Sequence, residues 1–416
     1  MPVRCRPIRR KMAIYFDNAA SMKTRAEALA AAMPYLAEEY GNPSSLHSPG
    51  LSAKKAVQKA REDIATCLWC RPNEIVFTSG GTESANLAIK GFFEANCERG
   101  KHIITTNIEH HAVSGSIEWL RRQGAEVTIL SVDGEGLITA EQVEAAIRPD
   151  TILIAIQFAN NEIGTVQPVE KIAAVAKRYG IAFFTDAVQA VGHLPFAMGS
   201  TVGAGKLPVG STSRDYEGVT MLSASAHKFG GPKGVGFLFV REGTKLAPQV
   251  HGGPQEMRLR AGTENVPGIV GMATALIISC RELRENMARM TALRNAMMDR
   301  ILEEIPDSRV NGSRASRLAG NVSVSLAGVE AASVLVLMDM AGIACSGGSA
   351  CTSAEGRVSH VIEAIGVPQG YQNGTVRFTF SGDTTREDVD AAVQALEETV
   401  RKLRKQANYS AYESII

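Results

Sequence analysis

The sequence predicts an α/β protein in which a large domain, built on a mainly parallel β-sheet flanked by helices, precedes a smaller α+β domain. From residue 74 onwards, strand-like apolar runs alternate with helical patterns of about ten residues, which is typical of βαβ units. A long helical pattern over residues 265–304 separates this region from a C-terminal part with alternating runs. The 416 residues, of which 45% are hydrophobic, suffice for two or three domains with large cores.

The N-terminal residues 1–13 are expected to form a disordered basic tail. Their positive charges are Arg4, Arg6, Arg9, Arg10 and Lys11. Because no apolar stretch follows these charges, a secretory signal peptide is not predicted. Met12 is an alternative start of the protein.

Charge and cysteine content narrow the function classes. The net charge of +1 gives no general attraction to nucleic acid or to a membrane. No run approaches the roughly 18 apolar residues of a membrane helix, so we expect neither partner. Seven irregularly spaced cysteines argue against a disulfide framework and favour a reducing compartment, the cytoplasm. Cys67 and Cys70 form one C-x-x-C without a second pair, so we predict no metal site and interpret them as helix-face packing, with redox chemistry as the alternative.

The large domain is expected to span residues 14–264. After a short apolar run at 14–17, helical periodicity appears at 25–40 and 51–68, with a turn cluster between them. The seven strand-like runs are residues 75–78, 102–106, 127–132, 151–158, 181–185, 219–224 and 235–240. The helical patterns between them are residues 81–98, 112–123, 140–147 and 169–179. Residues 198–217 are rich in Gly, Ser and Thr without a period, so we interpret them as an inserted surface loop or hairpin.

The C-terminal part is predicted to be a linker helix followed by the small domain. The linker is the helical pattern of residues 265–304, and the small domain spans residues 305–416. Strands are expected at 321–326 and 376–381, and helices at 331–340 and 387–406.

Polar side chains gather where the predicted strands of the large domain end. They are Thr82, His110, Asn161, Asp186 and Lys228. In open α/β sheets, ligands bind outside the carboxyl ends of the strands. The sequence therefore predicts a functional site at this edge of the sheet.

Three of these motifs point to a phosphorylated heteroaromatic ligand, although each has an ordinary structural alternative. Gly80, Gly81 and Thr82 follow a strand at a helix N-terminus, which favours phosphate but is also a common cap. Asp186 ends a buried strand; it is either a helix cap or the partner of a protonated ring nitrogen, as in pyridoxal 5′-phosphate (PLP) sites. His110 is either a cap or a residue that stacks on a ring and moves protons.

Two residues are candidate nucleophiles. Lys228 follows an apolar strand, where loss of hydration would lower the pKa of its amine. Cys351 lies among small polar residues, which indicates an exposed loop in which a thiolate can act. Cys345 lies closer to an apolar run and is interpreted as packing.

Several long motifs in one order resemble PLP-dependent cysteine desulfurases of the class V aminotransferase group, which have PLP fold type I. The resemblance covers residues 14–404, nearly the whole chain. The matching stretches are residues 16–20 (FDNAA), 41–45 (GNPSS), 77–84 (FTSGGTES), 160–164 (NNEIG), 186–189 (DAVQ), 225–228 (SAHK), 260–265 (RAGTEN) and 349–353 (SACTS). Two departures are the insertion at 198–217 and the stretch 356–359 (GRVS), where the family often has Leu-Glu-Pro-Ser.

The resemblance implies a role for each site residue. Lys228 would bind PLP covalently and carry the α-proton, and His110 would stack on the ring and help to deprotonate the substrate thiol. Asp186 would pair with the ring nitrogen, while Asn161 and Gln189 would hold the ring's phenolic oxygen. Arg377 would bind the substrate carboxylate, together with Asn161. The remaining implied residues would bind the phosphate: Gly81, Thr82, Ser225, His227 and, from the other subunit of a homodimer, Thr263.

The reaction that the resemblance implies is conversion of L-cysteine to L-alanine. The sulfur would become a persulfide on Cys351 and pass to an acceptor, such as an iron–sulfur scaffold protein or a tRNA-thiolation partner. A selenocysteine lyase, an aminotransferase of the same fold and a catalytically silent assembly protein are the alternatives. A selenocysteine lyase would not need Cys351, and an aminotransferase would use Lys228 without it.

Overall fold

The computed structural model describes residues 14–199, 216–348 and 358–406. The expected basic tail at 1–13, most of the expected insertion and Cys351 lie outside the described residues. At the ends of the insertion, the guanidinium of Arg241 donates to the carbonyls of Met198 (2.9 Å) and Tyr216 (3.0 Å), which joins the two flanks.

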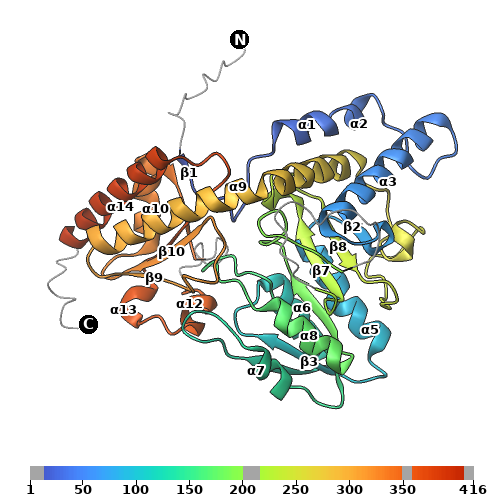
Figure 1. The fold of residues 1–416 in the computed structure, drawn as a ribbon, viewed down its shortest axis with the longest axis horizontal. Helices are drawn as coiled ribbons and strands as arrows, with labels where there is room; N and C mark the ends of the chain where they lie inside the picture. The colour runs from blue at the N-terminus through green and yellow to red at the C-terminus, as the bar shows by residue number, and fades with distance from the viewer. Residues whose placement is uncertain (1–13, 200–215, 349–357, 407–416) are drawn as a thin grey trace, which may run out of the picture.

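A seven-stranded sheet forms the centre of the larger part (Figure 1). Its strands, in spatial order, are β2 (Ile75–Thr78), β8 (Gly236–Val240), β7 (Met221–Ser225), β6 (Ala182–Asp186), β5 (Thr151–Ala155), β3 (His102–Thr106) and β4 (Glu126–Leu130). The strands from β7 to β4 are parallel, and β8 is antiparallel to both of its neighbours. The predicted fold class, α/β with a mainly parallel sheet flanked by helices, is therefore confirmed.

Helices bury both faces of this sheet, which explains the continuous apolar strands in the sequence. Neighbouring strand residues point to opposite faces, so Phe183 belongs to one core and Phe184 to the other. The core on the first face includes α3 (Ser48–Leu68), α7 (Ala140–Ala145), α8 (Val169–Tyr179) and the start of α9 (Val266–Glu304), and α1 (Ala26–Ala32) joins this core by packing against α9. The second face packs against α4 (Gly81–Asn86), the π-helix η2 (Leu87–Gly91), α5 (Phe92–Asn96) and α6 (His111–Arg122).

Two expected helices are divided in the structure. The pattern at 25–40 forms α1 and α2 (Pro34–Ala37), because Pro34 lacks the N–H that would continue α1. The pattern at 81–98 is interrupted by η2, whose residues keep the same apolar face. Three single turns complete this part: η1 (Pro72–Glu74), η3 (Ala226–Lys228) and η4 (Glu256–Arg258).

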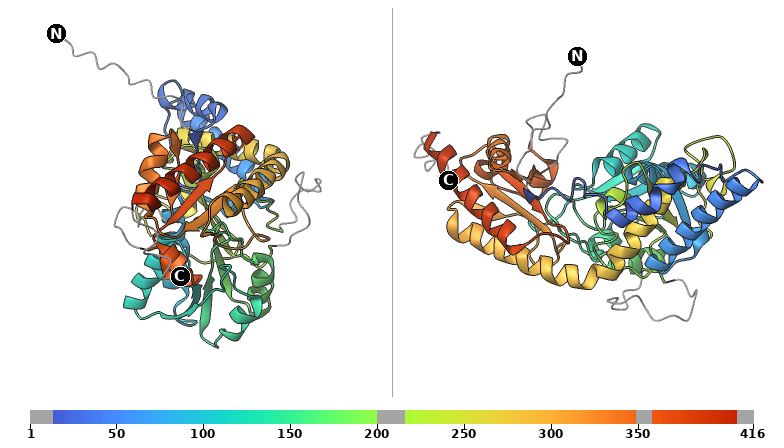
Figure 2. Two further views of the ribbon diagram at one scale, coloured as in Figure 1. Left: turned by 90° about the vertical axis from the view of Figure 1, so that its left-hand side faces the viewer. Right: turned by 90° about the horizontal axis from the view of Figure 1, so that it is seen from above.

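The C-terminal part contains an antiparallel four-stranded sheet. Its order is β12 (Ser346–Gly347), β13 (Thr375–Thr379), β10 (Asn321–Leu326) and β9 (Ser308–Val310). Met297 of α9, Val324 of β10 and Leu396 of α14 (Arg386–Gln406) meet in its core, with α10 (Ala331–Met340) beside them. The short helices α12 (His360–Ala364) and α13 (Gln369–Gln372) precede β13. Helix α9 runs from the large sheet to this sheet (Figures 1 and 2).

The N-terminal segment connects the two parts in a way that the sequence did not predict. Strand β1 (Ile14–Tyr15) pairs in parallel with β11 (Ile343–Ala344), and Phe16 is fully buried in the C-terminal core. The chain then continues to Ala19 and Ala20, which line a cavity beside the large sheet. Residues distant in sequence are thus brought to one site.

Helix α9 is long and apolar enough to cross a membrane by length and composition. This differs from the expectation that no run is so apolar. The reason is that α1 and α3 pack against α9, and 61% of its apolar window is buried inside the protein, as in a core helix.

Candidate active site

A cavity of about 290 Å³ lies at the carboxyl ends of the parallel strands. It brings together the predicted site residues Gly81, Thr82, His110, Asn161, Asp186, Gln189, Ser225, His227, Lys228 and Arg377. Ala19, Ala20, Ala112, Gln157, Ala159 and Val188 complete its lining. The polar residues at the strand ends therefore line one cavity.

Lys228 presents its amine to the N-terminal segment. The residue follows β7 within η3, and its Nζ donates to the carbonyl oxygens of Ala19 (2.6 Å) and Ala20 (2.9 Å). The ring of His193 contacts the carbonyl of Lys228 at 2.8 Å, which fixes the backbone here. Two backbone carbonyls of the N-terminal segment thus help to hold the amine at the cavity.

Asp186 ends β6 with its carboxylate largely buried, at 8% exposure. Its Oδ1 accepts from Ser223 Oγ (2.9 Å) and from the Val188 amide (3.1 Å). It forms no ion pair with another residue of the described ranges. A buried carboxylate is costly without a cationic partner, so this oriented group suits a ligand with a protonated ring nitrogen.

Another part of the cavity lining suits a phosphate. Gly81 begins α4, and a Cβ there would lie 2.5 Å from Val188 Cγ2, so the close approach requires glycine. Thr82 and Ser225 add hydroxyls to the lining, and backbone amides at a helix start attract anions. Burial, followed by the charges of Lys228 and Lys233, lowers the pKa of His227 to about 4. His227 is therefore a neutral hydrogen-bonding group near pH 7.

His110 is the N-cap residue of α6, where its Nδ1 accepts from the Ala112 amide at 3.1 Å. The ring lines the open cavity, yet surrounding protein atoms remove enough hydration to lower its pKa. Lys228 and the neighbouring histidines act in the same direction, whereas Asp186 opposes them. Protonation of Nδ1 would also break the cap. The structure therefore favours a neutral imidazole.

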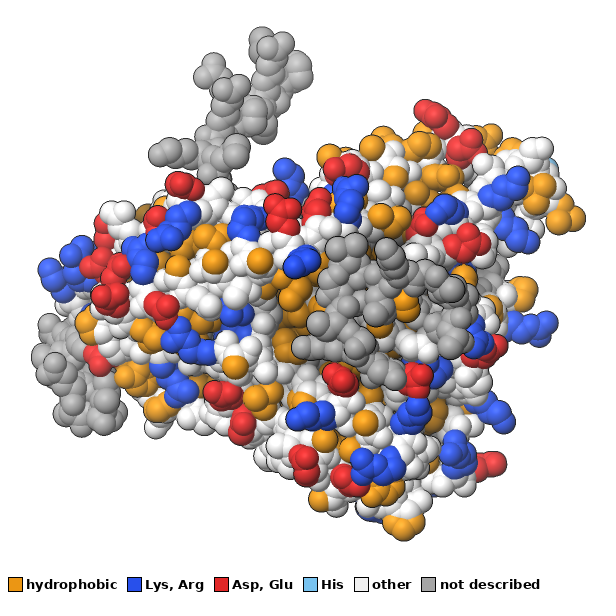
Figure 3. All heavy atoms as spheres, in the orientation of Figure 1, with side chains coloured by type: hydrophobic (Ala, Val, Ile, Leu, Met, Phe, Trp, Pro, Cys, Tyr) orange, Lys and Arg blue, Asp and Glu red, His pale blue; other side chains and the backbone are white. Residues whose placement is uncertain are grey.

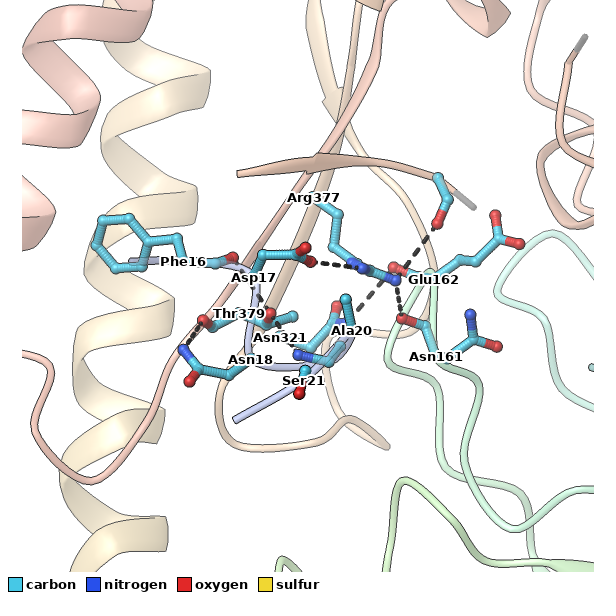
Figure 4. Close-up of polar contacts among 12 residues, drawn as sticks. Phe16, Asp17, Asn18, Ala20, Ser21, Asn161, Glu162, Asn321, Arg377 and Thr379 are labelled. Carbon is cyan, nitrogen blue, oxygen red and sulfur yellow. Dashed lines mark hydrogen bonds and ion pairs between the residues drawn. The ribbon is translucent and has the colours of Figure 1, made fainter. Parts of the chain in front are cut away.

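Arg377, on β13, reaches from the C-terminal sheet to the cavity (Figure 4). Its Nη1 donates to the Asn161 carbonyl (2.8 Å), and its Nη2 pairs with Asp17 Oδ1 (2.9 Å). The side chain is 2% exposed, and its buried Nε has no hydrogen-bond partner among the described residues. A guanidinium at a cavity wall can bind a carboxylate.

Of the other two predicted site residues, the structure describes only Thr263. Thr263 is exposed and lies outside the lining, in the loop before α9. Cys351 lies outside the described residues.

Two neighbouring buried residues were missed by the sequence reasoning. Gln157 lines the cavity and donates from Nε2 to the Ile108 carbonyl at 3.0 Å. The backbone amide of Gln157 also donates to the carboxyl of Glu109. Burial raises the pKa of this carboxyl to about 8. Gln157 could have been found as a polar residue near the end of a mostly apolar run; a buried Glu109 beside His110 had no such indication.

Comparisons with known proteins show the family to which the chain is similar. Residues 14–392 match the family model described as aminotransferase class-V. The chain is 44% identical over 399 residues to "Cysteine desulfurase IscS" of Dictyoglomus turgidum, covering 96% of this chain and 97% of the relative. It is 45% identical over 392 residues to the protein of the same name from Methanosarcina thermophila, covering 94% and 93%.

Solved structures show the same likeness. A structure described as "NIFS-LIKE PROTEIN" superposes with a TM-score of 0.84 at 35% identity, covering 94% of this chain and 100% of that chain. The family model and the relatives span nearly the whole chain. The chain therefore belongs to the aminotransferase class-V family.

Proposed function

We propose that the protein is a PLP-dependent cysteine desulfurase, which converts L-cysteine to L-alanine and holds the sulfur as a persulfide on Cys351. The observation that carries this proposal is the single cavity that joins the Lys228 amine, the buried Asp186 carboxylate and the Arg377 guanidinium. The names of the relatives support it, since they are cysteine desulfurases rather than selenocysteine lyases or aminotransferases.

The residues of the cavity fit PLP. Asp186 would hold the ring nitrogen, Asn161 and Gln189 the phenolic oxygen, and Lys228 the aldehyde carbon. Gly81, Thr82, Ser225 and His227 would hold the phosphate. When bound, PLP supplies an electron sink that makes the substrate's α-proton acidic.

The chain's own groups then orient the substrate and move protons. Arg377 and Asn161 hold the substrate carboxylate, so that the amino group faces Lys228. The Lys228 amine takes the α-proton and returns one to the product carbon. His110 would stack on the ring of bound PLP and assist deprotonation of the substrate thiol.

Sulfur transfer requires a second nucleophile, and we assign it to Cys351 from its motif. Its thiolate attacks the substrate sulfur, the carbon–sulfur bond breaks, and the new sulfur–sulfur bond leaves alanine after proton return. Cys345 is the nearest alternative in the sequence. Burial raises the pKa of the Cys345 thiol to about 12, which disfavours the thiolate there.

The working form that we propose is a cytoplasmic homodimer. Apolar side chains gather over α1 and α2 (Figure 3), where Leu29, Met33, Leu36 and Tyr40 are all more than half exposed. Pairing through this face would cover them, and the exposed Thr263 would then serve the partner's phosphate site. The described cysteines are all free, which suits a reducing compartment.

We further propose that residues 14–264 form the PLP-binding domain, and that α9 links it to a small domain, residues 305–416, that carries Cys351. A persulfide on that segment can be passed to an acceptor protein, such as an iron–sulfur scaffold or a tRNA-thiolation partner.

Incubation of the holoenzyme with L-cysteine and a reductant tests the proposed activity. We expect equal amounts of alanine and sulfide. A selenocysteine lyase would give two other results. The wild type would be inactive on cysteine, and Cys351→Ala would keep its activity on selenocysteine. Amino-group transfer to a keto acid without sulfide would identify an aminotransferase.

The lowered pKa of His110 gives a pH prediction. Because the neutral ring is the active form, activity falls only as the pH drops through the lowered pKa, below the ordinary value of 6.5. We expect the acid limb of kcat/KM for alanine formation to lie below pH 6.5 and to disappear in His110→Gln, with a rate loss of about 10²-fold.

A matched control is His47→Gln, because His47 Nδ1 also caps a helix, by accepting from the Gly50 amide of α3 at 3.3 Å. This variant should keep the wild-type pH profile. An unchanged acid limb in His110→Gln would show that another group titrates.

A further inference from the structure

We propose that Glu162 is a positioning residue for sulfur transfer, because its buried carboxylate contacts both flanks of the segment that carries Cys351. The inference rests on the proposed function. It concerns only the described flanks, Gly348 and Ser359, and the cavity wall that they contact.

Glu162 sits on a rigid turn at the cavity. Its amide donates to Asn160 Oδ1 at 2.8 Å, and the Nδ2 of Asn160 donates to the Ile108 carbonyl at 3.1 Å. The preceding residue, Asn161, lines the cavity. Glu162 itself is 2% exposed. Its carboxylate therefore has a fixed base, next to the residue that would hold both cofactor and substrate.

One carboxylate oxygen of Glu162 contacts both flanks. Its Oε2 accepts from Ser359 Oγ at 2.6 Å, and a Cβ added to Gly348 would lie 2.8 Å from the same atom. Ser359 is also the N-cap residue of α12, through the Val361 amide at 3.1 Å. Gly348 immediately precedes segment 349–357, and Ser359 follows it after a single residue. Glu162 thus joins Gly348, which precedes segment 349–357, to Ser359 at the start of α12, which follows it.

Arg377 connects this arrangement to the substrate position. Its Nη1 donates both to the Asn161 carbonyl (2.8 Å) and to the Gly348 carbonyl (3.4 Å). Figure 4 shows its guanidinium between Asp17 and the Asn161–Glu162 pair. The guanidinium that would bind the substrate carboxylate therefore also holds the flank that leads to Cys351.

Electrostatics agree with a role beyond packing. Burial raises the pKa of Glu162, whereas the Ser359 hydroxyl, Arg377 and His111 lower it. A buried carboxylate is retained at a cost, and an apolar contact would hold two segments together more cheaply. The carboxylate adds a fixed orientation, because the hydrogen bond from Ser359 and the contact with Gly348 meet at the same oxygen, Oε2.

Chain length makes this anchoring matter. Cys351 follows Gly348 by three residues, so their Cα atoms lie at most about 11 Å apart. The position of Gly348 therefore limits where the thiol can reach. Because a displacement of about 1 Å can reduce a rate by about 10²-fold, loosening this flank should slow persulfide formation more than substrate binding.

The test uses the holoenzyme and single-turnover persulfide formation on Cys351, followed by mass spectrometry. We expect Glu162→Gln and Ser359→Ala to slow this step by about 10- to 100-fold, with KM for L-cysteine within about twofold of wild type. Ser359→Thr keeps the hydroxyl and the cap and should restore the rate. The rate at which iodoacetamide alkylates Cys351 without substrate is a second measurement, and it should change in the two slow variants.

The matched control is Glu74→Gln. Glu74 is also 2% exposed, and it accepts from backbone amides of Arg71 and Glu242 far from the cavity lining. It should lose stability with a wild-type rate of persulfide formation. The proposal is overturned if Glu162→Gln keeps the wild-type rate, or if KM rises in proportion to the rate loss. If the wild type forms alanine but no persulfide on Cys351, the proposed function itself fails, whatever the variants do.

Discussion

Replacement of Lys228 by alanine should lower alanine formation from L-cysteine by about 10²- to 10⁴-fold, the usual contribution of a positioned proton-transfer group. The structure gives the reason. The amine is held at the cavity by two carbonyl oxygens of the N-terminal segment, at 2.6 and 2.9 Å, and the Asp186 carboxylate lines the same cavity. Without it, none of the other lysines in the described ranges lines the cavity to take and return the α-proton.

The measurement is alanine release by the purified variant, with the visible absorbance of bound PLP followed in parallel. Lys171→Ala is a suitable control, because this exposed lysine lies on α8, outside the cavity lining. It should retain wild-type turnover. Normal alanine release by Lys228→Ala would contradict the assignment of this residue.

Among the site variants considered, replacement of Arg377 by methionine should lower the free energy of unfolding most. The change leaves Asp17 without its partner and removes donors from the carbonyls of Asn161 and Gly348. Breaking a buried ion pair by removing one partner costs about 3–5 kcal/mol, and the partial exposure of Asp17 favours the lower end. KM for L-cysteine should also rise by about 10- to 100-fold, because the substrate carboxylate loses a charged donor.

Urea unfolding and steady-state kinetics separate these two effects. Arg294→Met is the control: Arg294 is also buried, and it donates to the carbonyls of Arg317 and Leu318, away from the cavity. It should lose stability with an unchanged KM. If Arg377→Met binds cysteine as well as the wild type, Arg377 is only a structural link between the two parts of the chain.

The sequence predicted those features that depend on local patterns. Apolar strand runs that alternate with helical patterns predicted the parallel sheet. Strands buried on both faces need continuous apolar residues, such as Phe183 and Phe184. The rule that ligands bind at the carboxyl ends of parallel strands then placed Asp186 and Lys228 in one site. Both line the cavity.

Features that depend on distant partners were not predictable in this way. Asp17 meets Arg377 across 360 positions of the chain, and β1 pairs with β11 although neither two-residue strand has a pattern of its own. Glu162 and Ser359 are separated by 197 positions. Such pairs are selected by how the two parts of the chain pack, and local propensity carries no information on that.

The most direct test of the proposed mechanism is to map the sulfur after one turnover. The holoenzyme is mixed with one equivalent of L-cysteine without reductant, alanine is measured, and the peptides are analysed by mass spectrometry. We predict one alanine per active site and one extra sulfur atom on the peptide that contains Cys351, with neither product in Cys351→Ser. Alanine formation with the extra sulfur on Cys345, or undiminished alanine formation by Cys351→Ser, would contradict the account.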